Sequence, residues 1–475
     1  MFDVVVIGAG ITGSLTALGL SGFRLHTAVL EKSNDIADGA TMANSAIVHT
    51  GYDPEDGTLK AELNVEGAAM YPKLTKDLGC MYKTVGAYVA ACGSEEEKHL
   101  SVLADRALRR GIPHEMLDGD MARCMESHLS DHVTKVLSFP TTAVIYPWEV
   151  AIAAMETAVN NGTELHLNTE VRGIRRIEGG YALDTTKGIF ETKMIISCAG
   201  THADRIARMV SDQVAYEIRP RKGEYYVLAK NTGLVNHIVF PVPGPKGKGV
   251  LAVPTVYGNV LIGPNSAYCS DPDCVAHTAE GLAEVKQNIA RTMKDVPFNK
   301  VIRSFAGLRP SSTSKDFIIT EYDDAPGFVD VASIESPGLA SAPAIAAYVI
   351  RNFVKKYFTL TVNEDAVMTR RRPLVMSELS VEERNEVIRK DPSYGRIVCR
   401  CEKISEGEIV DAIHRTCGAA TVKGIKKRVR PGMGRCQGGF CEPYVLELLA
   451  KEKGVSPLEV DLDGLGSEIL KGENR

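Results

Sequence analysis

Four of the eleven cysteines in this 475-residue chain are spaced in a way that can bind a metal centre. Cys399 and Cys401 are separated by one residue, and Cys436 and Cys441 follow 34 residues later, in the pattern C-x-C-x34-C-x4-C. Four thiolates on two loops can hold a [2Fe–2S] cluster or a structural zinc ion. Zinc ribbons prefer C-x2–4-C pairs, so the C-x-C pair favours the cluster. A site that no longer binds metal is the other alternative.

A second set of chemically informative residues opens the chain. An apolar stretch at residues 4–7 precedes Gly8-Ala9-Gly10-Ile11-Thr12-Gly13, and a second apolar stretch ends at Glu31. The pattern predicts a strand, a helix and a second strand that bind a dinucleotide. Gly8 permits the tight turn, Gly10 lets the backbone approach a pyrophosphate, and Gly13 lets the helix pack against the strand. Glu31 is placed to bind ribose hydroxyls, but the motif alone does not distinguish FAD from NAD.

Composition restricts the class of protein further. A chain of this length holds two or three domains, and its hydrophobic content of 44% is ordinary for a globular protein. The net charge of −5 does not favour nucleic acid or a membrane surface. We find no apolar run long enough to span a bilayer and no signal-peptide pattern, so we expect a cytoplasmic protein. The odd cysteine count makes a disulfide framework improbable, and Cys269 and Cys274, in a Pro- and Asp-containing loop, are expected to be free thiols.

The elements that would position these residues are discontinuous along the chain. Strand patterns at residues 165–171, 193–200 and 327–332, the last followed by a helix from about Ala342, belong with the N-terminal unit, and the alternating β patterns between them indicate a second domain. We expect a dinucleotide domain at 1–75, 141–214 and 316–360, and an inserted domain at 76–140 and 215–315. Residues 361–395 form a linker with one short helix, in which the basic triplet 370–372 is expected to be solvated rather than to bind an anion. A compact domain follows at 396–475, where Ser405 and Glu408 form a capping box that starts a helix, and Cys417 is expected between a helix and a strand.

Several motifs in the first 355 residues support a family assignment. They are Glu31-Lys32 with the N-terminal glycines, Ala40-Thr41-Met42-Ala43-Asn44-Ser45, Cys198-Ala199-Gly200, Ala306-Gly307-Leu308-Arg309-Pro310 and Ser336-Pro337-Gly338-Leu339. Together they resemble the FAD-dependent oxidoreductases of the D-amino-acid oxidase and glycerol-3-phosphate dehydrogenase superfamily. The resemblance implies an α/β fold in which a Rossmann-like FAD-binding domain carries an inserted α+β substrate domain.

The same resemblance implies which residues contact FAD. The 40–45 loop would run beneath the flavin and pyrophosphate, Val171 would meet the adenine, and Gly200 would lie close to the cofactor. The turn at Gly338 would direct a helix N-terminus toward the flavin, where its positive end stabilises negative charge. The residues implied in cofactor binding are Gly8, Gly10, Gly13, Glu31, Lys32, Thr41, Asn44, Ser45, Val171, Gly200, Gly307, Gly338 and Leu339.

Candidates for substrate chemistry come from the resemblance and from residue type. In this superfamily a strand with Gly-x-Arg presents its guanidinium above the flavin, so Arg309 is expected to bind a carboxylate or phosphate bidentately; the alternative is a surface ion pair. His49 is a candidate general base, flavin-polarising group or covalent flavin attachment point, or else a buried structural histidine. Tyr225 and Tyr257 are placed on the substrate-domain sheet, either to position substrate or simply to pack.

The C-terminal cysteines, with Gly432-Met433-Gly434 before Cys436, resemble the BFD-like [2Fe–2S] domain fused to A subunits of anaerobic glycerol-3-phosphate dehydrogenases. The resemblance implies oxidation of sn-glycerol 3-phosphate to dihydroxyacetone phosphate, with hydride transfer to flavin and electrons leaving through the cluster. The expected partners are a small anionic substrate and a second flavoprotein or iron–sulfur subunit, which could hold the protein at the inner face of a membrane.

Other functions stay open at this point. Residues 44–51 and the segment Lys222-Gly223-Glu224 are similar to L-2-hydroxyglutarate dehydrogenases, and an acidic Glu224 beside a phosphate would be unfavourable unless it points away. An amine or amino acid is a third substrate class. A non-catalytic electron-transfer subunit and a thiol- or metal-regulated sensor are alternatives of a different kind.

Overall fold

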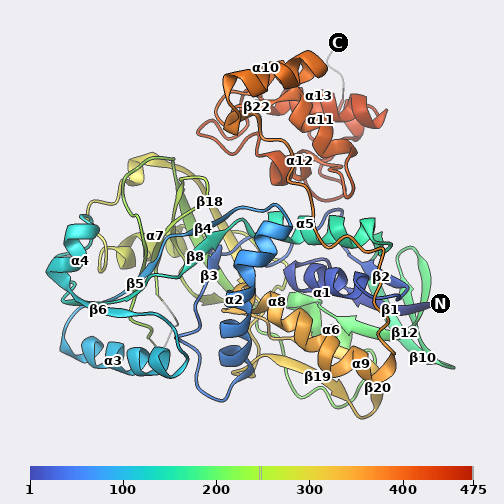
Figure 1. Ribbon diagram of the computed structural model, residues 1–475, viewed down its shortest axis with the longest axis horizontal. Coiled ribbons are helices and arrows are strands. Elements are labelled where there is room, and N and C mark those ends of the chain that lie inside the picture. The colour runs from blue at the N-terminus through green and yellow to red at the C-terminus, as the bar shows by residue number, and fades with distance from the viewer. Residues whose placement is uncertain (245–246, 248, 473–475) are drawn as a thin grey trace.

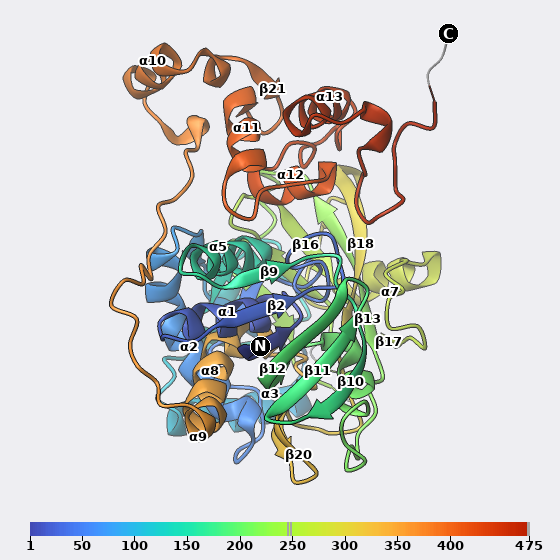
Figure 2. The same cartoon turned by 90° about the vertical axis from the view of Figure 1, so that its right-hand side faces the viewer.

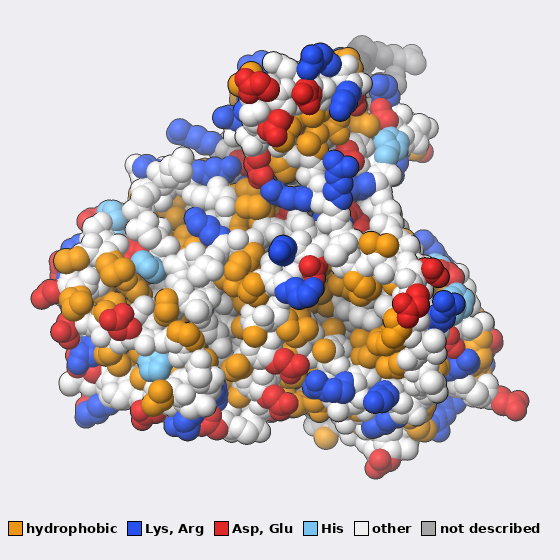
Figure 3. Space-filling view, viewed as in Figure 1, with side chains coloured by type: hydrophobic (Ala, Val, Ile, Leu, Met, Phe, Trp, Pro, Cys, Tyr) orange, Lys and Arg blue, Asp and Glu red, His pale blue; other side chains and the backbone are white. Residues whose placement is uncertain are grey.

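The computed structural model describes residues 1–244, 247 and 249–472 of the protein. Its larger part is built on two β-sheets, and a smaller C-terminal lobe sits above them (Figure 1), as the space-filling view of the same face also shows (Figure 3). Among the described residues no helix is long and apolar enough to cross a membrane.

The first sheet contains the N-terminal motif. Parallel β1 pairs with β2 on one side and with β12 on the other, and β20 extends the sheet beyond β12. Its strands are β1 Phe2–Ile7, β2 Thr27–Leu30, β9 Glu164–His166, β10 Val171–Ile177, β11 Gly180–Thr185, β12 Gly188–Ser197, β19 Ile318–Tyr322 and β20 Ala325–Ala332. Successive side chains of a strand point to opposite faces, so Val4 and Val6 enter one core and Val5 and Ile7 another. This burial on both faces explains the unbroken apolar run in the sequence.

Helices cover the first sheet. Helices α1 and α5 pack on each other, and α8 packs on both α1 and α2. Their bounds are α1 Ile11–Ser21, α2 Leu59–Asp77, α5 Pro147–Asn160, α6 Ala203–Ala207, α8 Gly338–Val349 and α9 Lys355–Tyr357. Helix α8 starts at Gly338, four residues before the expected start, because the chain turns directly from the Ser336-Pro337 segment into the helix.

The second sheet is assembled from two chain segments, one before and one after the strands β9–β12 of the first sheet. Its strands are β5 Ala87–Ala91, β6 Glu115–Asp118, β7 Lys135–Phe139, β13 Arg221–Leu228, β14 Ile238–Pro241, β15 Leu251–Pro254, β16 Val260–Gly263, β17 Ala267–Tyr268 and β18 Val301–Arg309. The helices α3 Ser94–Arg109, α4 Gly119–Met125 and α7 Ala279–Ile289 accompany them. A small sheet of β3 Ile47–Val48, β8 Ala143–Ile145 and β4 Tyr82–Thr84 lies where the chain passes between the two units.

The C-terminal lobe follows a connector that runs along the outside of the first unit (Figure 2). The connector contains α10 Val381–Lys390, as expected, and the lobe contains β21 Ile397–Cys399, β22 Ile404–Ser405, α11 Glu406–His414, α12 Val422–Val429 and α13 Glu442–Lys453. The predicted capping box at Ser405 and Glu408 is confirmed. No strand follows Cys417 in the described part of the lobe, because the chain goes from a loop directly into α12.

The first part of the connector is bonded to the unit built on the first sheet. The Arg24 N–H donates to the Thr361 carbonyl oxygen, and the Asn363 N–H donates to that of Gly22, so residues 361–363 lie along the end of α1. The expectation of a solvated basic triplet is wrong for Arg370, whose guanidinium is largely buried and pairs with the buried Glu156 carboxylate of α5. Only the tertiary fold brings that carboxylate to the connector.

Candidate active site

A cavity of about 1640 Å³ lies between the two sheets and the C-terminal lobe. Pockets for drug-sized ligands measure about 300–1,000 Å³, so this cavity has room for a dinucleotide and a further small molecule. It is lined by sixteen residues expected at the site: Gly8, Gly10, Glu31, Lys32, Thr41, Asn44, Ser45, His49, Val171, Gly200, Tyr225, Tyr257, Gly307, Arg309, Gly338 and Leu339. The fold therefore collects residues from across the first 340 positions at one place.

Two of the N-terminal glycines, Gly8 and Gly13, leave no space for a side chain. A Cβ on Gly8, whose φ is +99°, would stand 2.6 Å from the Cys198 carbonyl oxygen. A Cβ on Gly13 would stand 2.0 Å from the Gly8 carbonyl oxygen, which is why Gly13 packs α1 against β1 and does not itself line the cavity. The N-terminus of α1 opens on the cavity, where free N–H groups favour an anion.

Glu31 and Lys32 occupy the end of β2. The Glu31 carboxylate is buried and accepts hydrogen bonds from the backbone N–H groups of Ala9, at 2.7 Å, and Ser33, at 2.8 Å. Burial raises its pKa, since desolvation outweighs those hydrogen bonds. The half-exposed Lys32 ammonium pairs with Asp273 at 2.8 Å and lies 2.9 Å from His202 Nε2. The Cys269–Cys274 loop thus approaches the cavity through Asp273, and neither of its cysteines is in a disulfide.

The 40–45 loop is held by its own polar side chains. The Thr41 hydroxyl accepts a hydrogen bond from the Ile11 N–H at 2.9 Å, which connects the loop to the start of α1. The Asn44 amide donates to the Ala40 and Thr41 carbonyls and accepts from the Ala46 N–H. A Cβ on Gly307 would stand 2.0 Å from the Ala43 carbonyl oxygen, so the second sheet contacts this loop at van der Waals distance.

Arg309 ends β18, and its guanidinium lies across Gly223 of the neighbouring β13. A Cβ at residue 223 would stand 2.7 Å from Arg309 Nη2, so glycine makes the room. The guanidinium donates two long hydrogen bonds, to the carbonyls of Arg221 at 3.3 Å and Asn265 at 3.5 Å, and it also interacts with the Tyr225 side chain. Burial lowers its pKa, and the nearby Tyr225 opposes the shift. Its fork of N–H donors is therefore available to an anion in the cavity.

Glu224 points away from that anion position. Alternation along β13 places it on the opposite face from Gly223 and Tyr225, and it does not line the cavity. Its carboxylate is buried where α7 begins, accepting hydrogen bonds from the Thr278 N–H at 2.6 Å and the Asn265 amide at 2.8 Å. The acidic residue that made a phosphate substrate doubtful is thus separated from Arg309 by the sheet.

The other substrate candidates differ in their surroundings. His49 is buried, lines the cavity and packs against Phe240, with ring centroids 5.5 Å apart. The Tyr225 hydroxyl is 3.1 Å from the Ser45 hydroxyl, and its ring stacks on Phe305. Tyr257 is not on a strand but in the turn between β15 and β16, where it contacts the C-terminal lobe.

Two groups at the cavity were missed by sequence reasoning. Arg221 pairs with the Glu335 carboxylate at 3.0 Å, and Lys60 pairs with the same group at 2.9 Å, just before the Gly338 turn. Arg430 comes from the C-terminal lobe, and its guanidinium carbon stands 3.7 Å from the Tyr257 ring centroid. Neither the ion-paired group around Glu335 nor Arg430 belongs to a local sequence motif, although the Ser336-Pro337-Gly338 turn lies next to Glu335.

The four predicted metal-binding cysteines come together in the lobe. Cys401 and Cys436 have their sulfur atoms 3.7 Å apart. Burial raises the pKa of Cys441 to about 12, and the neighbouring thiols of Cys399 and Cys436 add to that shift. Among the described residues no three metal-binding side chains converge on one metal position.

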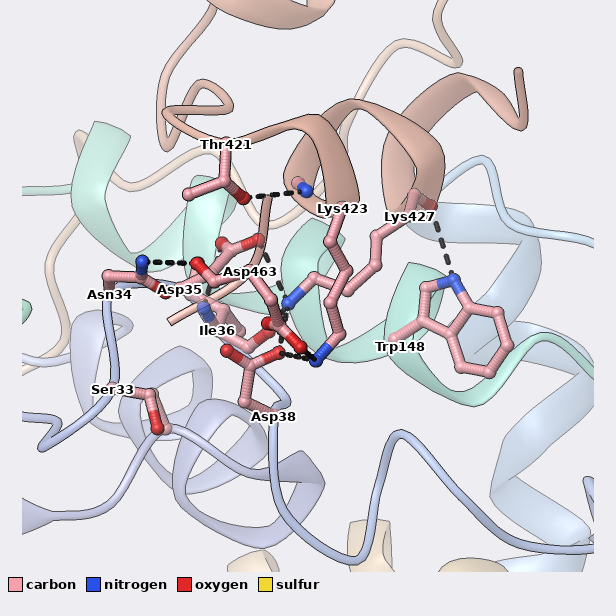
Figure 4. A network of polar contacts seen from close by, with 12 residues as sticks. Ser33, Asn34, Asp35, Ile36, Asp38, Trp148, Thr421, Lys423, Lys427 and Asp463 are labelled. Carbon is pink, nitrogen blue, oxygen red and sulfur yellow. Dashed lines mark hydrogen bonds and ion pairs between the residues drawn. The ribbon is translucent and has the colours of Figure 1, made fainter. Parts of the chain in front are cut away.

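A buried ionic network fixes the lobe above the cavity (Figure 4). The Lys427 ammonium of α12 pairs with Asp35 at 2.8 Å and Asp38 at 2.7 Å and donates to the Ile36 carbonyl oxygen at 2.6 Å. Lys423 reaches Asp38 and Asp463, and the Asn34 amide donates to the Asp463 carbonyl oxygen. Since Asp35 and Asp38 lie directly after the Glu31 strand, the lobe is attached to the same loop that borders the dinucleotide site.

Known proteins were compared with this chain. The family model "FAD dependent oxidoreductase" matches residues 3–351, and the model "BFD-like [2Fe-2S] binding domain" matches residues 397–451. The glycine cradle and the free helix N-terminus fit a bound dinucleotide, and the four thiols fit a cluster.

Individual relatives share most of the chain. A glycerol 3-phosphate dehydrogenase of Caloramator mitchellensis is 45% identical, covering 100% of this chain and 99% of its own length. An L-2-hydroxyglutarate dehydrogenase of Escherichia coli is 30% identical and covers 56% of this chain and 64% of its own length. Among solved structures, the dithionite-reduced, FAD-bound L-alpha-glycerophosphate oxidase of Mycoplasma pneumoniae superposes with a TM-score of 0.75 at 28% identity, covering 79% of this chain and 99% of its own.

Proposed function

Since the chain belongs to the FAD dependent oxidoreductase family and ends in a BFD-like [2Fe-2S] binding domain, we propose that it oxidises sn-glycerol 3-phosphate to dihydroxyacetone phosphate. FAD supplies a two-electron hydride acceptor, and the cluster supplies a one-electron outlet to a partner protein. The expected α/β fold and both cofactors are confirmed by the family matches.

The observation that carries the proposal is the position of Arg309. Its guanidinium lies against Gly223 and lines the cavity, and its hydrogen bonds to backbone carbonyls are long, at 3.3 and 3.5 Å. Glu224, the acidic residue of β13, is turned to the other face of the sheet. A planar fork of this kind binds phosphate bidentately. The full-length similarity to a glycerol 3-phosphate dehydrogenase supports the same substrate.

The remaining cavity residues supply positioning and proton transfer. Tyr225, fixed by Ser45 and Phe305, forms one wall beside Arg309. His49 is the side chain to which we assign acceptance of the substrate hydroxyl proton, because it is buried in the cavity on the loop that follows the 40–45 segment. Loss of that proton at the hydroxyl oxygen accompanies loss of hydride from carbon, which converts the alcohol to a ketone.

The test is an anaerobic titration of the flavin absorbance, with glycerol 3-phosphate and L-2-hydroxyglutarate in parallel. We expect bleaching by glycerol 3-phosphate. Arg309→Lys keeps the charge but loses the fork, so KM should rise by about tenfold or more, equivalent to one charged hydrogen bond. The matched control is Arg219→Lys, an exposed arginine outside the cavity.

L-2-hydroxyglutarate is the second candidate, because the Lys222-Gly223-Glu224 segment and the Escherichia coli relative favour it. Bleaching by that acid alone would replace our proposal with a 2-hydroxy acid dehydrogenase. Bleaching by neither compound would reject both and favour an amine substrate or an electron-transfer subunit.

A further inference from the structure

The thiols of the C-terminal lobe are unevenly covered. Cys399 and Cys441 are buried, with 1% and 2% exposure, whereas Cys401 is exposed and Cys436 partly so. Because the Cys401 and Cys436 sulfur atoms are 3.7 Å apart, the cluster position has one side closed by the lobe and one side near solvent. An electron would leave through the exposed side.

That exposed side carries an unusual combination of side chains. Phe440, between Cys436 and Cys441, is 89% exposed, which is the highest value among the exposed large hydrophobic residues of the described chain. Arg400 and Lys403 flank Cys401, and Arg435 precedes Cys436; all three are exposed. We call Arg400, Cys401, Lys403, Arg435 and Phe440 the cysteine-loop surface. Arg400 and Arg435 each adjoin one of two thiols whose sulfur atoms are 3.7 Å apart, and Lys403 and Phe440 follow those thiols by two and four residues, so all five side chains come from one small part of the lobe.

The charge of this surface is uncompensated. Within the described residues, Arg400, Lys403 and Arg435 make no ion pair or side-chain hydrogen bond, although the protein as a whole has a net charge of −5. The acid in the first loop, Glu402, is turned inward and paired with Arg430 at 3.1 Å and Lys230 at 2.8 Å. A local group of free cations on an acidic protein is the electrostatic complement of an acidic partner.

We propose that the cysteine-loop surface docks an acidic one-electron carrier protein, with Phe440 as the apolar anchor and the three cations as the rim. The inference rests on the proposed function and identifies the chemistry of the acceptor. An exposed aromatic residue near exposed cations suits a small, transient interface, in which aromatic residues provide much of the binding energy and charges provide the association rate.

The number of electrons released per substrate determines how the assay is read. One alcohol oxidised to a ketone releases two electrons and two protons, so it reduces two ferric haems to ferrous haems. The acidic haem domain of cytochrome b5 and the basic cytochrome c serve as probes of opposite charge. We expect faster reduction of cytochrome b5, with a rate that falls steeply as ionic strength rises. A readout independent of turnover is calorimetric binding of ferric cytochrome b5 to the oxidised holoenzyme without substrate.

Three variants test the surface, each checked for cluster content by its visible spectrum. Arg400→Glu with Lys403→Glu should weaken binding about tenfold or more at low salt. Phe440→Ala, which leaves all charges in place, should weaken it about tenfold while preserving the salt dependence. Lys187→Glu, an exposed charge reversal on the β11–β12 hairpin, is the matched control and should change nothing. Bleaching of the flavin by substrate should be unchanged in all of them, which separates this inference from the proposed function.

Several outcomes would overturn the inference. One is wild-type binding to cytochrome b5 that does not depend on salt, a measurement that needs no variant. A second is faster reduction of cytochrome c than of cytochrome b5. A third is binding to phosphatidylglycerol vesicles that the charge reversals abolish while cytochrome b5 reduction stays intact, because the surface would then bind a membrane.

Discussion

Removal of the Lys427 ammonium should undock the C-terminal lobe from the FAD-binding unit. The Lys427 side chain is 1% exposed and joins Asp35, Asp38 and the Ile36 carbonyl oxygen. Removing one partner of a buried ion pair costs about 3–5 kcal/mol. Because Asp35 keeps Arg428 and Asp38 keeps Lys423, we take the lower end of that range. A loss of about 3 kcal/mol lowers the ratio of docked to undocked protein by more than a hundredfold. Lys427→Met keeps the side-chain volume approximately and removes the charge together with the hydrogen bond to Ile36.

The chain contains its own reporter for this change. Trp148 is the single tryptophan, and its indole N–H donates to the Lys427 carbonyl oxygen at 3.2 Å. In Lys427→Met we expect a red-shifted Trp148 emission, faster proteolysis of the 361–395 connector and slower electron transfer out of the protein. Lys471→Met, which removes an exposed pair with Glu468 in the same lobe, should cost less than about 1 kcal/mol.

Low pH should also weaken the contact between the C-terminal lobe and the FAD-binding unit. Burial alone would raise the pKa of Asp35, but the adjacent Arg428 and Lys427 charges hold it well below its ordinary value. The stabilisation is therefore fully present at neutral pH and is lost as pH falls below about 4, where the unfolded carboxyl begins to bind protons. If Lys427→Met leaves the Trp148 emission and the connector cleavage indistinguishable from Lys471→Met, the network does not hold the lobe and our reasoning is refuted.

Two further predictions concern the FAD-binding unit. Gly307→Ala should displace the 40–45 loop, because its Cβ would stand 2.0 Å from the Ala43 carbonyl oxygen, and the flavin content of the purified protein should fall. Gly464→Ala, outside the cavity and with no protein atom within 4 Å of its Cβ, should retain flavin. Burial raises the pKa of Asp330 to about 7, although the hydroxyls of Tyr216 and Tyr322 both donate to it. Between about pH 4 and 7 the unfolded carboxyl has lost its proton while the folded one retains it. The free energy of unfolding therefore falls as pH rises through this range, by no more than about 4 kcal/mol. Asp330→Asn should flatten that fall in denaturant titrations at pH 5 and pH 8, and an unchanged slope would contradict it.

The N-terminal motif and the cysteine spacing were predictable from sequence because their information is local. Gly8, Gly10 and Gly13 act within one turn between a strand and a helix, so their spacing alone indicates the cradle. The capping box at Ser405 depends on a residue three positions away. The family resemblance extended the prediction to distant segments, and the residues it implied in cofactor binding line the cavity, with the exception of Gly13.

The tertiary structure decided which distant groups meet. Strand register turned Glu224 toward α7 and placed Gly223 under Arg309, and a pattern of alternating residues does not say which neighbour a strand will have. The pairing of Asp35 with Arg428 and Lys427 joins residues almost four hundred positions apart, and Glu156 meets Arg370 in the same way. Charged residues on helices and connectors usually face solvent, so composition predicts solvation. Only packing shows which of them are buried against a counter-charge and hold the C-terminal lobe over the cavity.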